Sequence, residues 1–122
     1  MKVVYVAGRY RASTEADVYS NIQEARKAGI RVAQLGGAPL IPQMNSAFMG
    51  GATGAGDDQF WLDATMALLR KCDAVYTVWN WFNSEGAKLE VAEAKSLGIP
   101  VLFSETELKD WLVWQRVLET AK

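Results

Sequence analysis

The residues best suited to chemistry lie in one short segment. Ser84 is followed two positions later by Gly86 and six positions later by Glu90. At the start of a helix, a serine hydroxyl and free backbone N–H groups bind an anion such as phosphate, helped by the helix dipole. Glu90 lies about one turn beyond Gly86, and a carboxylate beside a phosphate or sugar site is a candidate nucleophile. The simpler alternative is that Ser84 only caps the helix and that Glu90 pairs with a nearby lysine in solvent.

Side chains elsewhere in the chain can complete such a site. Asp63 would add a second carboxylate, and two acids suit cleavage of a glycosidic bond, because one attacks the sugar while the other protonates the leaving group. Arg9 and Arg11 follow the first expected strand, where a guanidinium meets a phosphate well. Tyr5 lies within that strand, and a buried tyrosine hydroxyl needs a partner. Each also has an ordinary interpretation, as an exposed helix residue, solvated arginines and a core tyrosine.

Composition narrows the chemistry further. The 122 residues contain no histidine and one cysteine, Cys72, which excludes Ser/His/Asp and Cys/His catalysis and the usual zinc sites. Gly51, Gly54 and Gly56 do not join a strand directly to a helix, as a dinucleotide-binding motif must, and the sequence has no P-loop motif. We therefore expect no metal and no cofactor, with catalysis carried by carboxylates, tyrosine, lysine or hydroxyls.

Charge and apolar content indicate the kind of partner. The formal net charge is −1, which argues against a nucleic-acid polymer bound by electrostatics. The sequence has no apolar run of the ~20 residues that a membrane span needs, and its start does not resemble a signal peptide. A single cysteine forms no intrachain disulfide. We expect a cytoplasmic protein that binds a small molecule and no membrane.

The apolar pattern predicts strands that alternate with helices. Strands are expected at residues 2–7, 38–42, 73–79 and 100–103, and helices at about 14–35, 57–72, 83–97 and 104–121. This order implies a parallel sheet with helices on both faces. The predicted fold class is α/β, a three-layer sandwich of the doubly wound Rossmann or flavodoxin-like kind, with about four or five strands in a single domain, residues 1–122.

Ligands of such sheets bind beyond the carboxyl ends of the strands. The loops expected at that edge are residues 8–13, 43–56 and 80–86. The second loop ends a segment, residues 32–56, that carries no charge. If it covers the pocket, it would recognise a base by hydrogen bonding and stacking, through Gln43, Asn45, Ser46 and Phe48.

Together these residues resemble the nucleoside 2-deoxyribosyltransferase-like superfamily, and within it the short DUF4406-type branch. The resemblance spans about residues 3–103 and rests on segments 4–8, 63–75, 84–90 and 98–101. It implies that Glu90 is the nucleophile, that Asp63 protonates or holds the base, and that Tyr5 orients Glu90. It also implies a homodimer or higher homo-oligomer. We expect substrate or phosphate to be bound by Gly8, Arg9, Arg11, Asn45, Ser84 and Gly86.

The residues and the resemblance predict cleavage or exchange of the N-glycosidic bond of (deoxy)nucleosides or nucleoside 5′-monophosphates. Glu90 would attack C1′ and form a covalent glycosyl-enzyme. Water would then release the sugar in a hydrolase, and a second base would take it in a transferase. Two alternatives remain open. In the first, the chain is a non-catalytic nucleotide-binding module. In the second, it is an interaction protein that oligomerises through its last helix, which carries Trp111 and Trp114.

Overall fold

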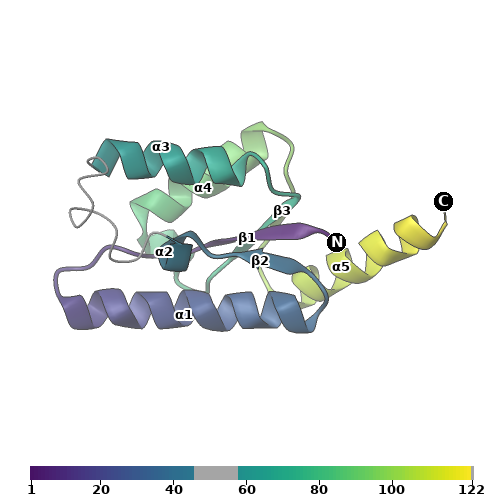
Figure 1. Ribbon diagram of the computed structural model, residues 1–122, viewed down its shortest axis with the longest axis horizontal. Coiled ribbons are helices and arrows are strands. Elements are labelled where there is room, and N and C mark those ends of the chain that lie inside the picture. Colours follow the sequence, from purple (N-terminus) through teal and green to yellow (C-terminus); the bar gives the residue numbers. More distant parts are fainter. Residues whose placement is uncertain (46–57, 122) are drawn as a thin grey trace.

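The computed structural model describes residues 1–45 and 58–121, and its strands and helices alternate as predicted (Figure 1). The elements are β1 (Val3–Ala7), α1 (Glu15–Gln34), β2 (Ala38–Leu40), α2 (Pro42–Asn45), α3 (Asp58–Leu69), β3 (Ala74–Thr77), the 3-10 helix η1 (Trp81–Asn83), α4 (Glu85–Ser96), β4 (Val101–Leu102) and α5 (Glu105–Thr120). Each strand is shorter than predicted. The predicted loop 43–56 begins within α2, a helix that the sequence pattern did not reveal, and the rest of that loop lies outside the described residues.

The strands form one parallel sheet in the order β2-β1-β3-β4. This is the flavodoxin-like order, so the predicted α/β fold class is confirmed. The chain moves from β1 outward to β2 and then crosses back to β3 on the other side of β1. The connection after β1 therefore leads toward one edge of the sheet and the connection after β3 leads toward the other. A crevice is expected at the carboxyl ends of these two strands.

The two faces of the sheet are covered by different helices (Figure 1). Side chains of α1 and α5 pack with Val4 on one face, and Val6 packs with α1 as well. Tyr5 and Ala7 point to the opposite face, where they pack with α3 and α4. Because side chains alternate along a strand, this register sends the Tyr5 side chain toward the helix that carries Glu90.

Three predicted helix caps are present. The hydroxyls of Thr14, Ser84 and Ser104 each accept a hydrogen bond, at 3.1 Å, from the backbone N–H three residues later. Gly36 and Gly98 follow α1 and α4 with positive φ angles of 93° and 73°, which glycine adopts without strain. The helix that carries Glu90 is therefore fixed at both ends by the residues that the sequence indicated.

The two tryptophans of helix α5 lie in different surroundings. Leu108 and Leu112 are buried against the sheet, and Trp111 packs against the same core. Trp114 and its neighbours Val117 and Leu118 are exposed, and the end of the helix projects from the body (Figure 1).

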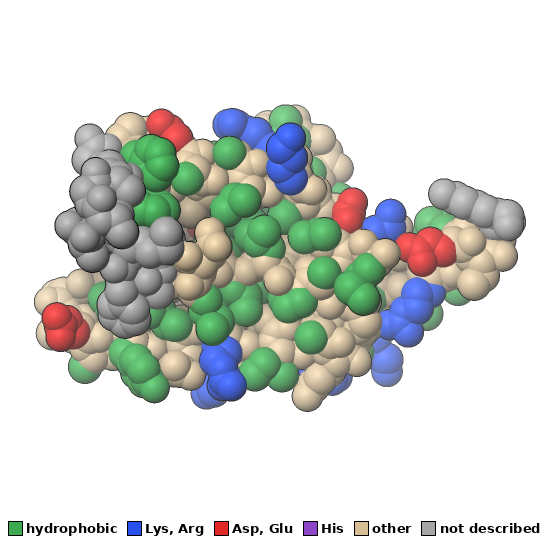
Figure 2. Space-filling model, viewed as in Figure 1, with side chains coloured by type: hydrophobic (Ala, Val, Ile, Leu, Met, Phe, Trp, Pro, Cys, Tyr) green, Lys and Arg blue, Asp and Glu red, His purple; other side chains and the backbone are tan. Residues whose placement is uncertain are grey.

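Another part of the surface is also apolar. In Figure 2, hydrophobic side chains gather along the middle of one face, over the edge of the sheet formed by β2 and between α1 and α3. Pro39 and Pro42 lie within and just after that edge strand, and they lack the N–H groups with which another strand would pair. Within the described residues, no helix is long and apolar enough to cross a membrane.

Candidate functional site

A cavity of about 600 Å³ opens at the carboxyl ends of β1 and β3, the position expected from the strand order. Its walls come from β1 and the loop after it, from α2 and α3, and from the segment that joins η1 to α4. Six predicted substrate or catalytic residues on two of these walls share the cavity with Tyr5: Gly8, Arg9, Arg11, Ser84, Gly86 and Glu90. These residues lie far apart in the sequence and meet because parallel strands end at a common edge.

Glu90 has an unusual electrostatic environment in the cavity. Its carboxyl is only partly exposed, and burial raises its pKa from 4.5 to about 7. The neighbouring Tyr5 hydroxyl lowers this pKa, but by less than burial raises it. Near neutral pH the carboxyl therefore exchanges readily between its neutral and ionised forms, as expected of a group that takes part in chemistry.

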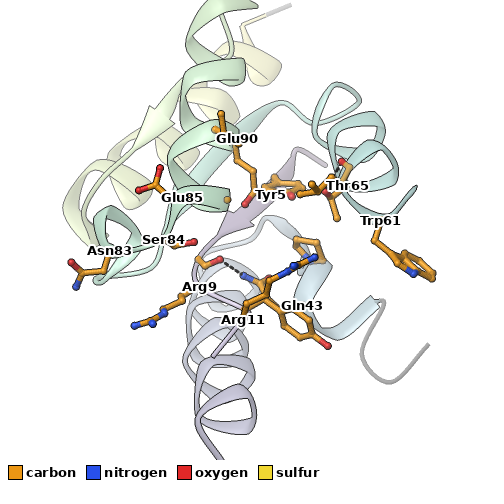
Figure 3. Close-up of a pocket in the computed structure, with 16 residues that line it drawn as sticks. Tyr5, Arg9, Arg11, Gln43, Trp61, Thr65, Asn83, Ser84, Glu85 and Glu90 are labelled. Atoms are coloured by element: carbon orange, nitrogen blue, oxygen red, sulfur yellow. Dashed lines mark hydrogen bonds between the residues drawn. The ribbon is translucent and has the colours of Figure 1, made fainter. Parts of the chain in front are cut away.

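Tyr5 and Thr65 stand beside this carboxyl. Figure 3 shows Glu90 of α4, Tyr5 of β1 and Thr65 of α3 around one part of the cavity. The pKa of Tyr5 is raised well above its usual value, first by burial and then by Glu90, while Thr65 opposes the rise. The Tyr5 hydroxyl is buried, yet among the described residues it has no hydrogen-bond partner at regular geometry. Such a group is costly unless another state of the site supplies a partner.

The opposite part of the cavity carries cations and backbone donors. Arg9 and Arg11 lie here, near Ser84 at the start of α4 (Figure 3). The Ser84 oxygen already accepts a bond from Ala87 N at 3.1 Å, so the hydroxyl proton is what it can offer a ligand. At Gly86 an added Cβ would meet nothing closer than the Ser84 hydroxyl at 3.8 Å. This end is open, positive and rich in donors.

Two predicted site residues, Asp63 and Asn45, are not among those that line the cavity. The Asp63 side chain is exposed and accepts a hydrogen bond from Gln59 at 2.9 Å. Asn45 is exposed at the end of α2. Among the described residues, the carboxylates that line the cavity are Glu90 and Glu85, and Glu85 is exposed and paired with Lys88. The expected pairing of Asp63 with Glu90 is therefore not seen.

Residues that the sequence interpretation left out also line the cavity. Trp61 and Thr65, one helical turn apart on α3, face it together. The Trp61 indole nitrogen is buried without a partner among the described residues. Only the four-residue spacing of these two side chains could have indicated that they share one helix face, and nothing in the sequence showed which face met the cavity.

Gln43, which was expected to contact a base, is almost completely buried in the cavity wall. Its exposed fraction is 4%, and its Nε2 donates to the Gly8 carbonyl at 3.1 Å (Figure 3). That bond fixes the side chain, while its Oε1 has no partner among the described residues. The backbone comes close here, because a Cβ added to Gly8 would lie 2.6 Å from Val78 Cγ2. Gly8 therefore serves packing as well as the cavity.

The fold and the cavity define a Rossmann-like α/β protein with an ionisable carboxyl at the switch point of its sheet. Comparison with protein families identifies the chain further: the model of DUF4406, a domain of unknown function, matches residues 2–103, and the chain belongs to this family. Among curated proteins, none matches the sequence significantly.

A solved structure has a similar fold. It is a 2-deoxyribosyltransferase from the psychrotolerant bacterium Bacillus psychrosaccharolyticus, described as a biocatalyst for the synthesis of nucleosides. The superposition has a TM-score of 0.61 with 16% sequence identity, and it covers 81% of this chain and 69% of the other. At this identity the likeness establishes the fold, and the chemistry must be argued from the site.

Proposed function

We propose that this protein cleaves or exchanges the N-glycosidic bond of (deoxy)nucleosides or their 5′-monophosphates, with Glu90 as the nucleophile. The observation that carries the proposal is the position of Glu90, in a cavity at the switch point, with its pKa raised to about 7 and the Tyr5 hydroxyl beside it. The fold shared with a 2-deoxyribosyltransferase supports the same class of reaction. Small-molecule nucleosides or nucleotides are then the substrates.

The reaction has two steps. In the first, the ionised Glu90 carboxylate attacks C1′ of the sugar, the C1′–N bond breaks, and the base leaves with the bonding electrons and takes up a proton. In the second, water or another base attacks C1′ of the glycosyl ester and gives up a proton to solvent, while the bond from C1′ to the Glu90 oxygen breaks and the carboxylate is regenerated. Tyr5 orients the carboxylate through its hydroxyl, which is the donor beside Glu90.

The source of the proton for the base follows from the position of Asp63. Asp63 is exposed and bonded to Gln59, so in this arrangement it does not reach a base in the cavity directly. Solvent in the open cavity is then the nearest proton source, and Asp63 acts at most through water.

Substitution of Asp63 by asparagine is therefore expected to have a small effect. We expect the Asp63→Asn variant to release base at more than a tenth of the wild-type rate, because the side chain has no direct contact with the cavity. Initial rates of base release at saturating substrate measure this effect. A loss of 100-fold or more would show that Asp63 enters the cavity during the reaction.

The positive end of the cavity supports a substrate that carries a 5′-phosphate. Arg9, Arg11 and the start of α4 line this end, and a phosphate there would gain both the guanidinium contacts and the helix dipole. With Glu90 about one turn further along the same helix, C1′ of a nucleotide would face the carboxylate while its phosphate stayed near Ser84. A neutral nucleoside would use only part of this arrangement.

The Gly86→Ala substitution tests the phosphate position. The empty cavity has room for the methyl group, since its nearest neighbour would be 3.8 Å away, so we expect the protein to fold normally. A phosphate close to the backbone at this position has no such room. We expect KM for a nucleoside 5′-monophosphate to rise by about tenfold, corresponding to ~1.4 kcal/mol, with little change for the nucleoside. Equal changes for both substrates would place the phosphate elsewhere.

The proposed reaction is tested by incubating the protein with a panel of nucleosides, deoxynucleosides and their 5′-monophosphates. Chromatography detects the free base, and a second base added to the mixture distinguishes transfer from hydrolysis. The matched control is Glu93→Gln, because Glu93 lies on the same helix, pairs with Arg70 and does not line the cavity. If the wild type releases no base but a nucleotide raises its melting temperature, the protein is a binding module.

A further inference from the structure

Three oxygen-bearing side chains meet in the cavity, and one of them has no role in the steps above. Thr65 comes from α3, Tyr5 from β1 and Glu90 from α4 (Figure 3). The Tyr5 hydroxyl has Glu90 on one side and Thr65 on the other in this view.

The hydrogen-bond capacity of these groups limits how they can pair. Thr65 Oγ1 donates its proton to the Leu62 carbonyl at 2.9 Å, which leaves the oxygen of Thr65 as an acceptor toward the cavity. Tyr5 has one hydroxyl proton to donate. This proton is buried with no partner at regular geometry among the described residues. Two acceptors, the Glu90 carboxylate and the Thr65 hydroxyl, therefore compete for one donor.

We propose that Thr65 is a positioning residue, whose hydroxyl oxygen accepts the Tyr5 proton whenever Glu90 does not. The inference rests on the proposed function, in which Glu90 alternates between a carboxylate and a glycosyl ester. When Glu90 is ionised, the Tyr5 hydroxyl donates its proton to the Glu90 carboxylate. Once Glu90 carries a sugar or a proton it becomes a weaker acceptor, and the Tyr5 hydroxyl turns to Thr65.

This arrangement keeps a buried hydroxyl paired through both halves of the reaction. Without the Thr65 oxygen, the Tyr5 proton has a strong acceptor only when Glu90 is ionised, and pairing a buried donor with a weak acceptor is less favourable. Removing the Thr65 hydroxyl therefore penalises the neutral form of Glu90 relative to the ionised form. The same change penalises the glycosyl ester.

The isosteric substitution Thr65→Val tests the inference through the pKa of Glu90. The measurement is the pH titration of the 13C-labelled glutamate carboxyl carbons, in which the Glu90 signal is assigned by its loss in Glu90→Gln. We expect the pKa of Glu90 to fall by about half a unit to one unit, the size of one neutral hydrogen bond. Thr65→Ser keeps the hydroxyl and should restore the wild-type value. If Thr65→Val does not fold, Thr65→Ala is read in the same way.

A double substitution separates the proposed pairing from a general effect of packing. In a Tyr5→Phe background no phenol proton remains, so Thr65→Val is expected to leave the pKa of Glu90 unchanged. The other ionisable groups near Tyr5 or in the cavity are the same in every variant: Cys72, Arg9, Tyr10, Arg11 and Glu85. An unchanged or raised pKa in Thr65→Val, or an equal fall in the Tyr5→Phe background, would overturn the inference.

The titration also keeps this inference distinct from the proposed reaction, because it requires no turnover. If the pKa of Glu90 responds as expected but no nucleotide releases base, the pairing of Tyr5 with Thr65 stands and the proposed function fails. If base is released but the pKa does not respond, Thr65 is only part of the cavity wall.

Discussion

Replacing Glu90 with glutamine is expected to lower the rate of base release by about 10³-fold or more. The amide has nearly the shape of the carboxyl but is a poor nucleophile, so the glycosyl ester cannot form. Substrate binding should survive, because the groups at the phosphate end, Ser84, Arg9 and Arg11, are untouched. The loss should therefore appear in kcat, with KM changed little.

Turnover and binding must be measured on the same preparation to test this expectation. Base release is followed at saturating nucleotide, and binding is followed by the shift of melting temperature with nucleotide concentration. Glu93→Gln, which replaces an ion-paired glutamate of the same helix, should retain activity close to that of the wild type. A Glu90→Gln variant with more than a tenth of the wild-type rate would remove Glu90 from its role as nucleophile.

The second large effect of Glu90→Gln concerns stability, because the substitution is expected to stabilise the folded protein. Burial raises the pKa of Glu90 to about 7 in the folded protein, against 4.5 for an unperturbed glutamate. Between these two pH values the unfolded chain has released the proton while the folded protein still holds it, so raising the pH favours unfolding. Above pH 7 the folded protein contains an ionised, poorly hydrated carboxylate. Glutamine at position 90 removes that cost.

We expect the free energy of unfolding of the wild type to fall relative to Glu90→Gln between about pH 4.5 and pH 7. The difference should reach on the order of 2 kcal/mol at pH 8 and be constant below about pH 4.5, where both states of the wild type are protonated. Urea denaturation over a range of pH measures it. A difference that does not vary with pH would mean that the carboxyl is as well solvated in the cavity as in the unfolded chain.

These two expectations together describe a residue retained for chemistry at a cost in stability. A buried carboxyl that served only packing would be more stable as an amide or an apolar side chain, and its replacement would leave turnover unchanged. Opposite changes in activity and stability from one substitution are the distinguishing result.

The part of the site that could be predicted from the sequence depends on local spacing and on the topology of the sheet. Ser84, Gly86 and Glu90 lie on one helix, so their relative positions follow from helical geometry once the cap is recognised. The position of Tyr5 beside Glu90 follows from two rules. Ligands bind at the carboxyl ends of parallel strands, and side chains alternate between the two faces along β1. The first inference uses local helix geometry, and the second uses the topology of the sheet.

The position of Asp63 could not be predicted in the same way, because it depends on how α3 is rotated against the sheet. Successive residues of a helix point about 100° apart, so Trp61 and Thr65 face the cavity while Asp63 between them does not. The apolar residues of α3 are spread around the helix, and their pattern alone did not identify the buried face. Tertiary packing decided the rotation.

The region after β2 shows a second limit of prediction from the sequence. The run of residues 38–42 is apolar, as expected of a buried strand, yet β2 ends at Leu40 and Pro42 begins a helix of four residues. Proline is well suited to the first turn of a helix because it needs no N–H there. This short helix positions Gln43 in the cavity wall and leaves Asn45 exposed. The predicted contacts of Ser46 and Phe48 with a base lie outside the described residues.

The inner and outer sides of helix α5 are under different constraints. The family match ends at residue 103, just before this helix begins at Glu105, and α5 packs on the face of the sheet opposite Tyr5 and α4. Leu108 and Leu112 must remain apolar to cover that face. On the outward side of the helix Trp114 is exposed, and it is not among the residues that line the cavity. Substitutions on this surface can therefore change what the helix contacts while the walls of the cavity stay as they are.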